Sequence, residues 1–239
     1  MKAYVITIMN NPESAHFANR CIASAPKLNI QYFNAITPDD DTIKILNENN
    51  IEDLNNFKID QKYSRMERCI AAFLSHLHCW KKSVEYNQNV IIFEHDAIVT
   101  GNIPTNLNFD KVITLAKPSY GNYNTPTHLG VGPLTQKPYF GGAHGYMVSP
   151  KGAKDLLKKA ETDAGPTDVF LHLNNFPFLQ EYYPWIVEAK DSFTTIQNEK
   201  GCRAKHMSVS YTHLRAHETP EHLVFRHVRE KKRGGGGGG

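Results

Sequence analysis

Residues 89–99 decide the fold, and they read Asn-Val-Ile-Ile-Phe-Glu-His-Asp-Ala-Ile-Val. The β-branched and aromatic run at 90–93 is typical of a strand buried on both faces, as in a parallel sheet. Acidic residues follow at its carboxyl end, where open α/β sheets bind their ligands. On an extended backbone the Glu94 and Asp96 carboxylates would point the same way and could share one hard cation that bridges two phosphates. The alternative is a strand that simply ends in solvated charges.

Outward from this strand, the apolar pattern predicts alternating strands and helices. Strands are expected at residues 3–9, 30–34, 111–115 and 146–149, with an edge strand at 185–187. Helices are expected from the turn at 10–14 to about residue 25, over 42–49, 66–86 and 150–160, and briefly after 168. The helix at 66–86 has the clearest apolar stripe, which Ser75, His76 and His78 interrupt. A lone histidine on such a helix is more often packed or exposed than a ligand.

The composition is that of an ordinary globular chain of 239 residues, 40% hydrophobic and 21% charged. This length supports one substantial core, or one core with a small appendage. No apolar run is long enough for a membrane span, and the N-terminus resembles a first strand rather than a signal peptide. Four cysteines without CxxC spacing fit a reducing compartment, so we expect a cytoplasmic protein with buried thiols.

The formal net charge of +3 belongs to the C-terminal tail. Residues 207–239 hold six Lys or Arg and three Glu, which leaves 21 basic and 21 acidic residues in 1–206. The neutral domain gives no argument for nucleic-acid binding. The tail has no amphipathic pattern, ends in six glycines and resembles translated adapter read-through. We therefore assign the domain to residues 1–206 and interpret 207–239 as a non-native or disordered tail.

Three later segments are further candidates for the site. Residues 118–139 are rich in Gly, Pro, Thr, Asn and Tyr, and a loop of this length is usually functional or mobile. Gly142 opens a Gly-Ala-His-Gly stretch whose glycines permit close backbone approach, while His144 is either packed or turned toward a ligand. Asp168 ends a Gly-Pro-Thr-Asp turn, where it is either a helix N-cap or a general base.

Four segments resemble, in order and spacing, the motifs of glycosyltransferase family 25, which includes lipooligosaccharide and collagen galactosyltransferases. Residues 71–82 resemble its Leu-Ser-His and Trp-Lys helix, 91–97 its Ile-Leu-Glu-Asp-Asp-Ala, 142–153 its Gly-Thr-x-Gly-Tyr-x-x-Ser-x-x-Ala, and 166–168 its Pro-Val-Asp. The resemblance covers about residues 2–200. The chain departs from these motifs at 68–71, at His95, which replaces an acid, and at Asn10 and Asn11, which replace a basic cluster.

The resemblance implies a GT-A-like fold, a Rossmann-type mixed sheet flanked by helices. It also implies an inverting transfer of a sugar, most often galactose, from a UDP-sugar to a glycan or lipooligosaccharide acceptor. The expected partners are this donor and acceptor, without nucleic acid and without a transmembrane segment. Peripheral association with a membrane stays an open alternative.

The resemblance also implies the residues of the site. A divalent cation, Mn²⁺, would be held by Glu94 and Asp96 and would neutralise the charge that builds on the leaving diphosphate. The implied donor-binding residues are Gly142, His144, Ser75 and His76. Asp168 would be the general base that takes the proton of the acceptor hydroxyl.

Two other functions compete with this one. His95 and the missing basic cluster would suit a catalytically weak relative that acts as a nucleotide-sugar or glycan-binding module. A metal-dependent phosphohydrolase would need a second cluster of metal ligands, which Asp168 and His144 could supply, although the chain has no phosphohydrolase motif.

Overall fold

The computed structural model describes residues 1–58, 64–104 and 106–189. The tail predicted at 207–239, and with it the boundary after 206, lies outside the described residues. Three cysteines are described, Cys21, Cys69 and Cys79, and all three are free and buried, as predicted.

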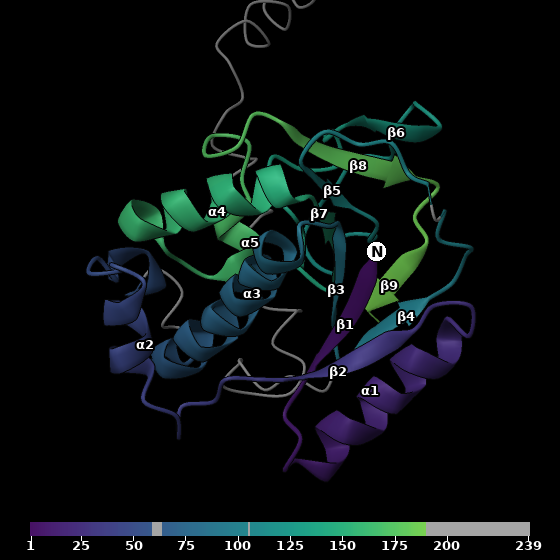
Figure 1. The fold of residues 1–239 in the computed structure, drawn as a ribbon. Helices are drawn as coiled ribbons and strands as arrows, with labels where there is room; N and C mark the ends of the chain where they lie inside the picture. Colours follow the sequence, from purple (N-terminus) through teal and green to yellow (C-terminus); the bar gives the residue numbers. More distant parts are fainter. Residues whose placement is uncertain (59–63, 105, 190–239) are drawn as a thin grey trace, which may run out of the picture.

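A seven-stranded sheet forms the centre of the molecule, in the order β2-β1-β3-β7-β5-β8-β6 (Figure 1). Its strands are β1 (Lys2–Thr7), β2 (Ile30–Asn34), β3 (Val90–Glu94), β5 (Val112–Thr114), β6 (Gly130–Pro133), β7 (Gly145–Val148) and β8 (Leu179–Tyr183). β1, β2 and β3 are parallel, while β7 is antiparallel to its neighbours β3 and β5. β8 is parallel to β5, and β6 is antiparallel to β8. The sheet is therefore mixed, and helices flank it.

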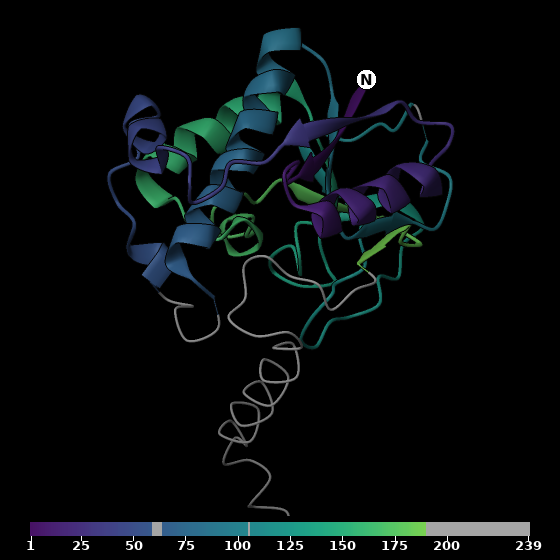
Figure 2. The same cartoon turned by 90° about the horizontal axis from the view of Figure 1, so that it is seen from below.

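Helices cover both faces of this sheet. α3 (Met66–Tyr86) and α4 (Pro150–Asp163) lie on one face, and α1 (Pro12–Ser24) lies on the other (Figures 1 and 2). A two-stranded sheet of β4 (Ala97–Val99) and β9 (Val187–Ala189) packs on the α1 side. Three short helices, α2 (Thr42–Glu48), η1 (Asn55–Lys58) and α5 (Thr167–Phe170), contact α3. None of the helices in the described ranges is long and apolar enough to span a bilayer.

Strand β3 is buried on both faces, as predicted from the apolar run at 90–93. Val90 and Ile92 belong to the core under α3, whereas Ile91 and Phe93 belong to the core under α1. Its surroundings differ from the parallel sheet that the apolar run suggested, because only β1 is parallel to it.

The chain order makes the carboxyl end of β3 a topological switch point of the sheet. The chain leaves β1 through α1 to reach β2, then returns through α3 to β3 on the other side of β1. The strand order thus reverses between β1 and β3, and open α/β sheets bind ligands at such a switch point. Because β7 runs antiparallel to β3, its first residue, Gly145, lies opposite Phe93 at the same edge.

Strong local patterns were predicted well, and weak ones were missed. The helix Met66–Tyr86 and the strand Ile30–Asn34 have the predicted bounds. β6 was missed because its Gly-Val-Gly-Pro sequence has little strand propensity, and its place at the sheet edge tolerates proline. The strand expected at 185–187 lies at Val187–Ala189, and β8 was not predicted.

Candidate functional site

Glu94 occupies the switch point at the carboxyl end of β3. Its backbone N–H donates to the His144 carbonyl at 3.2 Å, which ties the end of β3 to the glycine-rich segment before β7. Its side chain points to the α3 side, where carboxylate Oε1 lies 3.3 Å from His76 Nε2. The side chain is 31% exposed, so a ligand outside the carboxyl end of β3 can reach it. The glycine-rich segment therefore lies directly beside Glu94.

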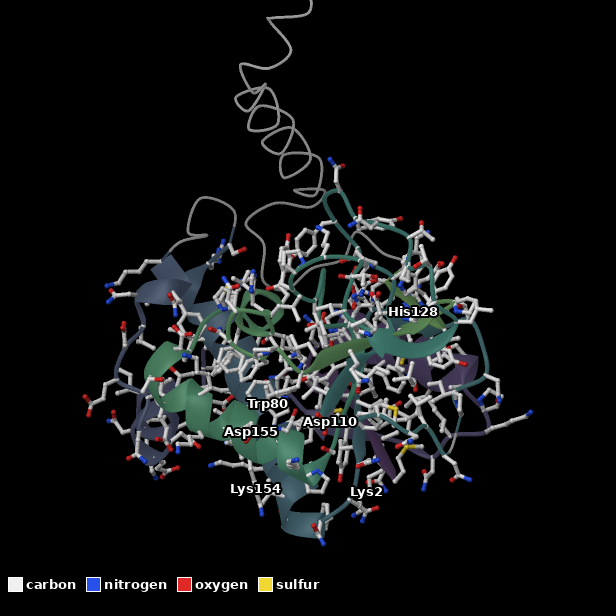
Figure 3. The ribbon with its side chains drawn as sticks, turned by 90° about the horizontal axis from the view of Figure 1, so that it is seen from above. Lys2, Trp80, Asp110, His128, Lys154 and Asp155 are labelled. Atoms are coloured by element: carbon white, nitrogen blue, oxygen red, sulfur yellow. The ribbon has the colours of Figure 1, made fainter. Side chains whose placement is uncertain are left out.

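A buried hydrogen-bond chain orients the Glu94 carboxylate. Trp80 Nε1, which can only donate, bonds to the Tyr146 hydroxyl oxygen at 2.8 Å. The Tyr146 hydroxyl lies 2.9 Å from His76 Nδ1. The neutral histidine tautomer that satisfies both neighbours accepts from Tyr146 at Nδ1 and donates from Nε2 to Glu94. We call this series of hydrogen bonds through Trp80, Tyr146, His76 and Glu94 the Trp80–Glu94 relay. Figure 3 labels Trp80, which lies next to α4 in that view.

The relay also sets the charge states at this site. Burial alone would raise the pKa of Glu94, but the hydrogen bond from His76 and the nearby imidazoles of His144 and His95 outweigh it and lower that pKa. Burial raises the pKa of Tyr146 well above its ordinary value, so this residue stays a neutral phenol that can donate. Glu94 is therefore a carboxylate anion at neutral pH, a group that can accept hydrogen bonds.

The backbone turns directly after Glu94, which corrects one premise of the metal prediction. Residues 95 and 96 form a turn between β3 and β4, so the extended backbone that would align Glu94 with Asp96 is not present. The Asp96 charge acts on Cys21 of α1, whose pKa burial and Asp96 raise to about 12. The His95 ring lies 6.5 Å from that of Phe17, also in α1. The sharing of one cation by Glu94 and Asp96 stays a prediction.

Ser75 and His76 have different placements although they are adjacent on α3. His76 is 1% exposed and contributes to the site by orienting Glu94. The fully buried Ser75 hydroxyl donates to the Ala71 carbonyl at 2.9 Å and accepts from the Ile36 N–H at 2.9 Å. Ser75 thus attaches α3 to the chain after β2, and its contact with the donor stays a prediction.

Asp168 lies in a second cluster, in the first turn of α5. The N-cap of this helix is Pro166, so the N-cap interpretation of Asp168 is wrong. Carboxylate Oδ1 accepts from the Val169 N–H at 2.9 Å, and the Tyr120 hydroxyl donates to Oδ2. Burial lowers the pKa of Lys137, and the Asp168 charge opposes this shift.

The glycine-rich segment connects the two clusters. Ser119, next to Tyr120, donates to the Gly141 carbonyl from its backbone N–H at 2.7 Å and from its hydroxyl at 3.2 Å. Gly142 has φ +107°, and a Cβ there would lie 2.6 Å from Ser119 Oγ and 2.7 Å from His144 Nδ1. His144 is buried beside Glu94. The segment thus runs from the neighbours of Asp168 to the neighbours of Glu94.

The sequence alone did not identify Tyr120 or Lys137 as site residues, and it did not indicate the role of Tyr146 in the relay. Tyr120 and Lys137 lie in the 118–139 segment, whose length and composition already indicated a functional loop. Nothing in the local pattern signals their meeting with Asp168, because Tyr120 is 48 residues away from it. Tyr146 belongs to the quoted motif, but its partner His76 is 70 residues away.

Comparison with known proteins identifies the family. No curated protein sequence matches the chain. A solved glycosyltransferase involved in the glycosylation of the major capsid of PBCV-1 is similar at 9% identity and a TM-score of 0.37, over 87% of this chain and 100% of that one. The model of glycosyltransferase family 25 (LPS biosynthesis protein) matches residues 1–171 of 239. The chain therefore belongs to glycosyltransferase family 25.

Proposed function

We propose that this transferase moves a hexose, expected to be galactose, from a UDP-sugar to a glycan or lipooligosaccharide acceptor with inversion at the anomeric carbon. The observation that carries the proposal is the ionised Glu94 at the switch point between β1 and β3, oriented by the Trp80–Glu94 relay. A GT-A-like arrangement and a cytoplasmic location belong to the same proposal. Free buried cysteines suit such a reducing compartment.

The residues present suit a divalent cation that is completed by the donor. No group of three or more His, Cys, Asp or Glu side chains is arranged to hold a metal within the described ranges. Nucleotide-bound cations commonly take one or two carboxylates and complete their shell with phosphate oxygens and water. Glu94, with Asp96 as the predicted second ligand, would hold such an ion. When bound, Mn²⁺ would stabilise negative charge on the leaving diphosphate.

Asp168 is the proposed general base. In the inverting step the acceptor oxygen bonds to the anomeric carbon on the face opposite UDP. The bond from that carbon to the phosphate oxygen breaks, and its electron pair leaves with UDP. The acceptor proton passes to the Asp168 carboxylate, whose orientation is held by Tyr120 and the Val169 N–H. Gly142 would admit the donor close to the backbone, and His144 would support Glu94 beside it.

A UDP-release assay on the full chain tests this proposal. The donors are UDP-galactose, UDP-glucose, UDP-N-acetylglucosamine and UDP-N-acetylgalactosamine, each with Mn²⁺, with Mg²⁺ and with EDTA. We expect UDP release from one donor, faster with Mn²⁺ than with Mg²⁺, and none in EDTA, because Mn²⁺ tolerates a neighbouring imidazole such as His95 better. Glu94→Gln should lose most of this activity.

Exposed Glu161→Gln on α4 is the control for loss of one charge. Binding of UDP without UDP release from any donor would contradict transferase activity and favour a nucleotide-sugar or glycan-binding module. Release of inorganic phosphate instead of UDP would identify a phosphohydrolase.

A further inference from the structure

A pocket of about 350 Å³ opens beside the Asp168 cluster, within the segment that connects β5 to β7. Its lining includes Asn122, Tyr123, Asn124, Gln136 and Lys137, and it is closed by Leu173 from the chain after α5. The same segment carries His128 next to β6, which Figure 3 labels. No residue that lines the pocket in the described structure is acidic.

Gln136 supplies an unused buried hydrogen-bond acceptor in this pocket. The residue is 1% exposed, and its amide Nε2 faces the Ala116 carbonyl at 3.5 Å. That neighbour assigns the other amide atom as the carbonyl oxygen Oε1, which has no hydrogen-bond partner among the described residues. Leaving a buried acceptor unsatisfied is costly, so this atom requires a water molecule or a ligand group that donates to it.

The wall that holds Gln136 is built by the fold. The fully buried Glu181 carboxylate of β8 accepts from the Thr135 N–H at 2.9 Å, from the Thr135 hydroxyl at 2.5 Å and from the Gln136 N–H at 3.2 Å. The Gln136 carbonyl accepts from the Asn124 N–H at 2.9 Å. The backbone on both sides of the amide is therefore anchored, and the orientation of Gln136 does not depend on a ligand.

Lys137 joins this pocket to the proposed general base. Its side chain is largely buried, at 7% exposure, and lies over the rings of Tyr120 and Tyr139 at 4.9 and 5.0 Å. Its ammonium group is 3.3 Å from the Tyr139 hydroxyl, and its charge interacts with Asp168. One end of the pocket therefore faces the cluster in which Asp168 would accept a proton.

We infer that this pocket binds the sugar ring of the acceptor glycan, with Gln136 Oε1 accepting one ring hydroxyl and the attacked hydroxyl directed toward Asp168. The identification of this sugar as the acceptor rests on the proposed function. Amide groups, a hydroxyl and an aromatic face suit the many neutral hydroxyls and apolar ring face of a hexose. The volume lies near the lower end for ligand pockets, which fits one sugar ring better than a whole UDP-sugar.

Saturation-transfer NMR on the full chain tests sugar binding without any need for turnover. The probes are the methyl glycosides of galactose, glucose and N-acetylglucosamine. We expect wild type to transfer saturation to at least one probe and Gln136→Leu to bind it about tenfold more weakly, because the buried hydrogen bond is lost. Gln31→Leu, on the exposed face of β2, is the matched control and should bind like wild type. Added UDP should not displace the probe.

A second variant protects the test against a folding defect in Gln136→Leu. Tyr123 lines the pocket and is 39% exposed, so Tyr123→Ala removes a ring face without opening the core. It should also weaken probe binding. The inference is overturned if no probe binds wild type, if both pocket variants bind like wild type, or if UDP competes with the sugar.

Kinetics separates this inference from the proposed function. With the active donor and the best probe as acceptor, Gln136→Leu should raise the acceptor KM about tenfold and leave the donor KM within about twofold. A larger rise in the donor KM would assign the pocket to the donor and overturn the inference. If wild type never releases UDP while sugar binding still depends on Gln136, the proposed function fails and the pocket stands as a sugar site. If wild type releases UDP but sugar binding does not depend on Gln136, the proposed function stands and the inference about the pocket fails.

Discussion

At the scale of single residues, Asp168 is the proposed general base of the transfer step. Asp168→Asn keeps an oxygen that can accept from Tyr120, so the melting temperature and the affinity for UDP should stay close to those of wild type. The amide cannot take the acceptor proton, and loss of a general base typically costs about 10²–10⁴-fold in turnover. Steady-state kinetics with the active donor measures the loss. Turnover equal to wild type would refute the base assignment.

Tyr146 has a role that only its hydroxyl can perform. In Tyr146→Phe the ring still fills the core, but Trp80 Nε1 and His76 Nδ1 both lose their partner. We expect the free energy of unfolding to fall by about 1–3 kcal/mol, the usual range for buried polar groups left unsatisfied. Urea denaturation measures this loss. UDP-release kinetics should show a further loss of activity, because Glu94 is no longer oriented. Normal activity together with lowered stability would mean that the relay is structural only.

Glu94 should make the fold sensitive to acid. Burial favours the protonated form, but His76 and the other nearby histidines outweigh it, so the pKa of Glu94 is lowered from 4.5 in the folded state. A carboxylate with a lowered folded pKa stabilises the protein above its unfolded pKa, and this stabilisation is lost as the pH falls through the folded pKa.

The unfolding free energies of wild type and Glu94→Gln should therefore converge as the pH falls below about 4.5. Urea denaturation in steps from about pH 7 to about pH 3 follows this difference. Glu161→Gln controls for the loss of one charge. If the difference in unfolding free energy between wild type and Glu94→Gln does not shrink in acid, the lowered pKa of Glu94 is contradicted.

At the scale of elements, the glycine-rich segment before β7 is held in a shape that a side chain would disturb. Gly142 and Gly130 both have positive φ, at +107° and +77°, but nothing lies within 4 Å of a Cβ built on Gly130. Gly130→Ala should therefore cost only the backbone strain, about 1–2 kcal/mol.

Gly142→Ala should cost about 1–3 kcal/mol more, because the methyl group also meets Ser119 and His144. It should reduce donor use as well, since His144 lies beside Glu94. Chemical denaturation and donor KM compare the two variants. Equal stability losses would show that the segment yields to the methyl group.

At the scale of the whole molecule, the described cores predict where the chain can be shortened. Both hydrophobic cores are built from residues between Ala3 and Val187. A chain ending at residue 206 should thus melt within about 5 °C of the full chain, or about 2 kcal/mol for a domain of this size. A chain ending at 171, where the family match ends, loses β8 from between β5 and β6 and should not unfold cooperatively. Calorimetry compares both shortened chains with the full chain, and a larger drop for the chain ending at 206 would show that the tail stabilises the domain.

Local sequence was sufficient wherever an element could be recognised from its own residues. The continuous apolar run of β3 and the 3.6-residue stripe of α3 determine their own structure, because each buries the side chains that its period places on one face or both. The family motifs are local in the same sense, since they lie on α3, β3, β7 and α5. These elements were sufficient to predict a mixed α/β transferase with a site at the end of β3.

Only the tertiary structure decided which of these residues meet. The backbone turns after β3, the Glu94 carboxylate lies beside His76, and the Asp96 charge acts on Cys21, none of which the spacing of the two carboxylates indicated. β6 and the wall of the pocket depend on β8, because Glu181 holds Thr135 from 46 residues away. Such contacts depend on the packing of distant segments against one another. Short-range periodicity contains no information about that packing. The sequence by itself therefore determined the helices and strands, and the tertiary structure determined which residues form the site.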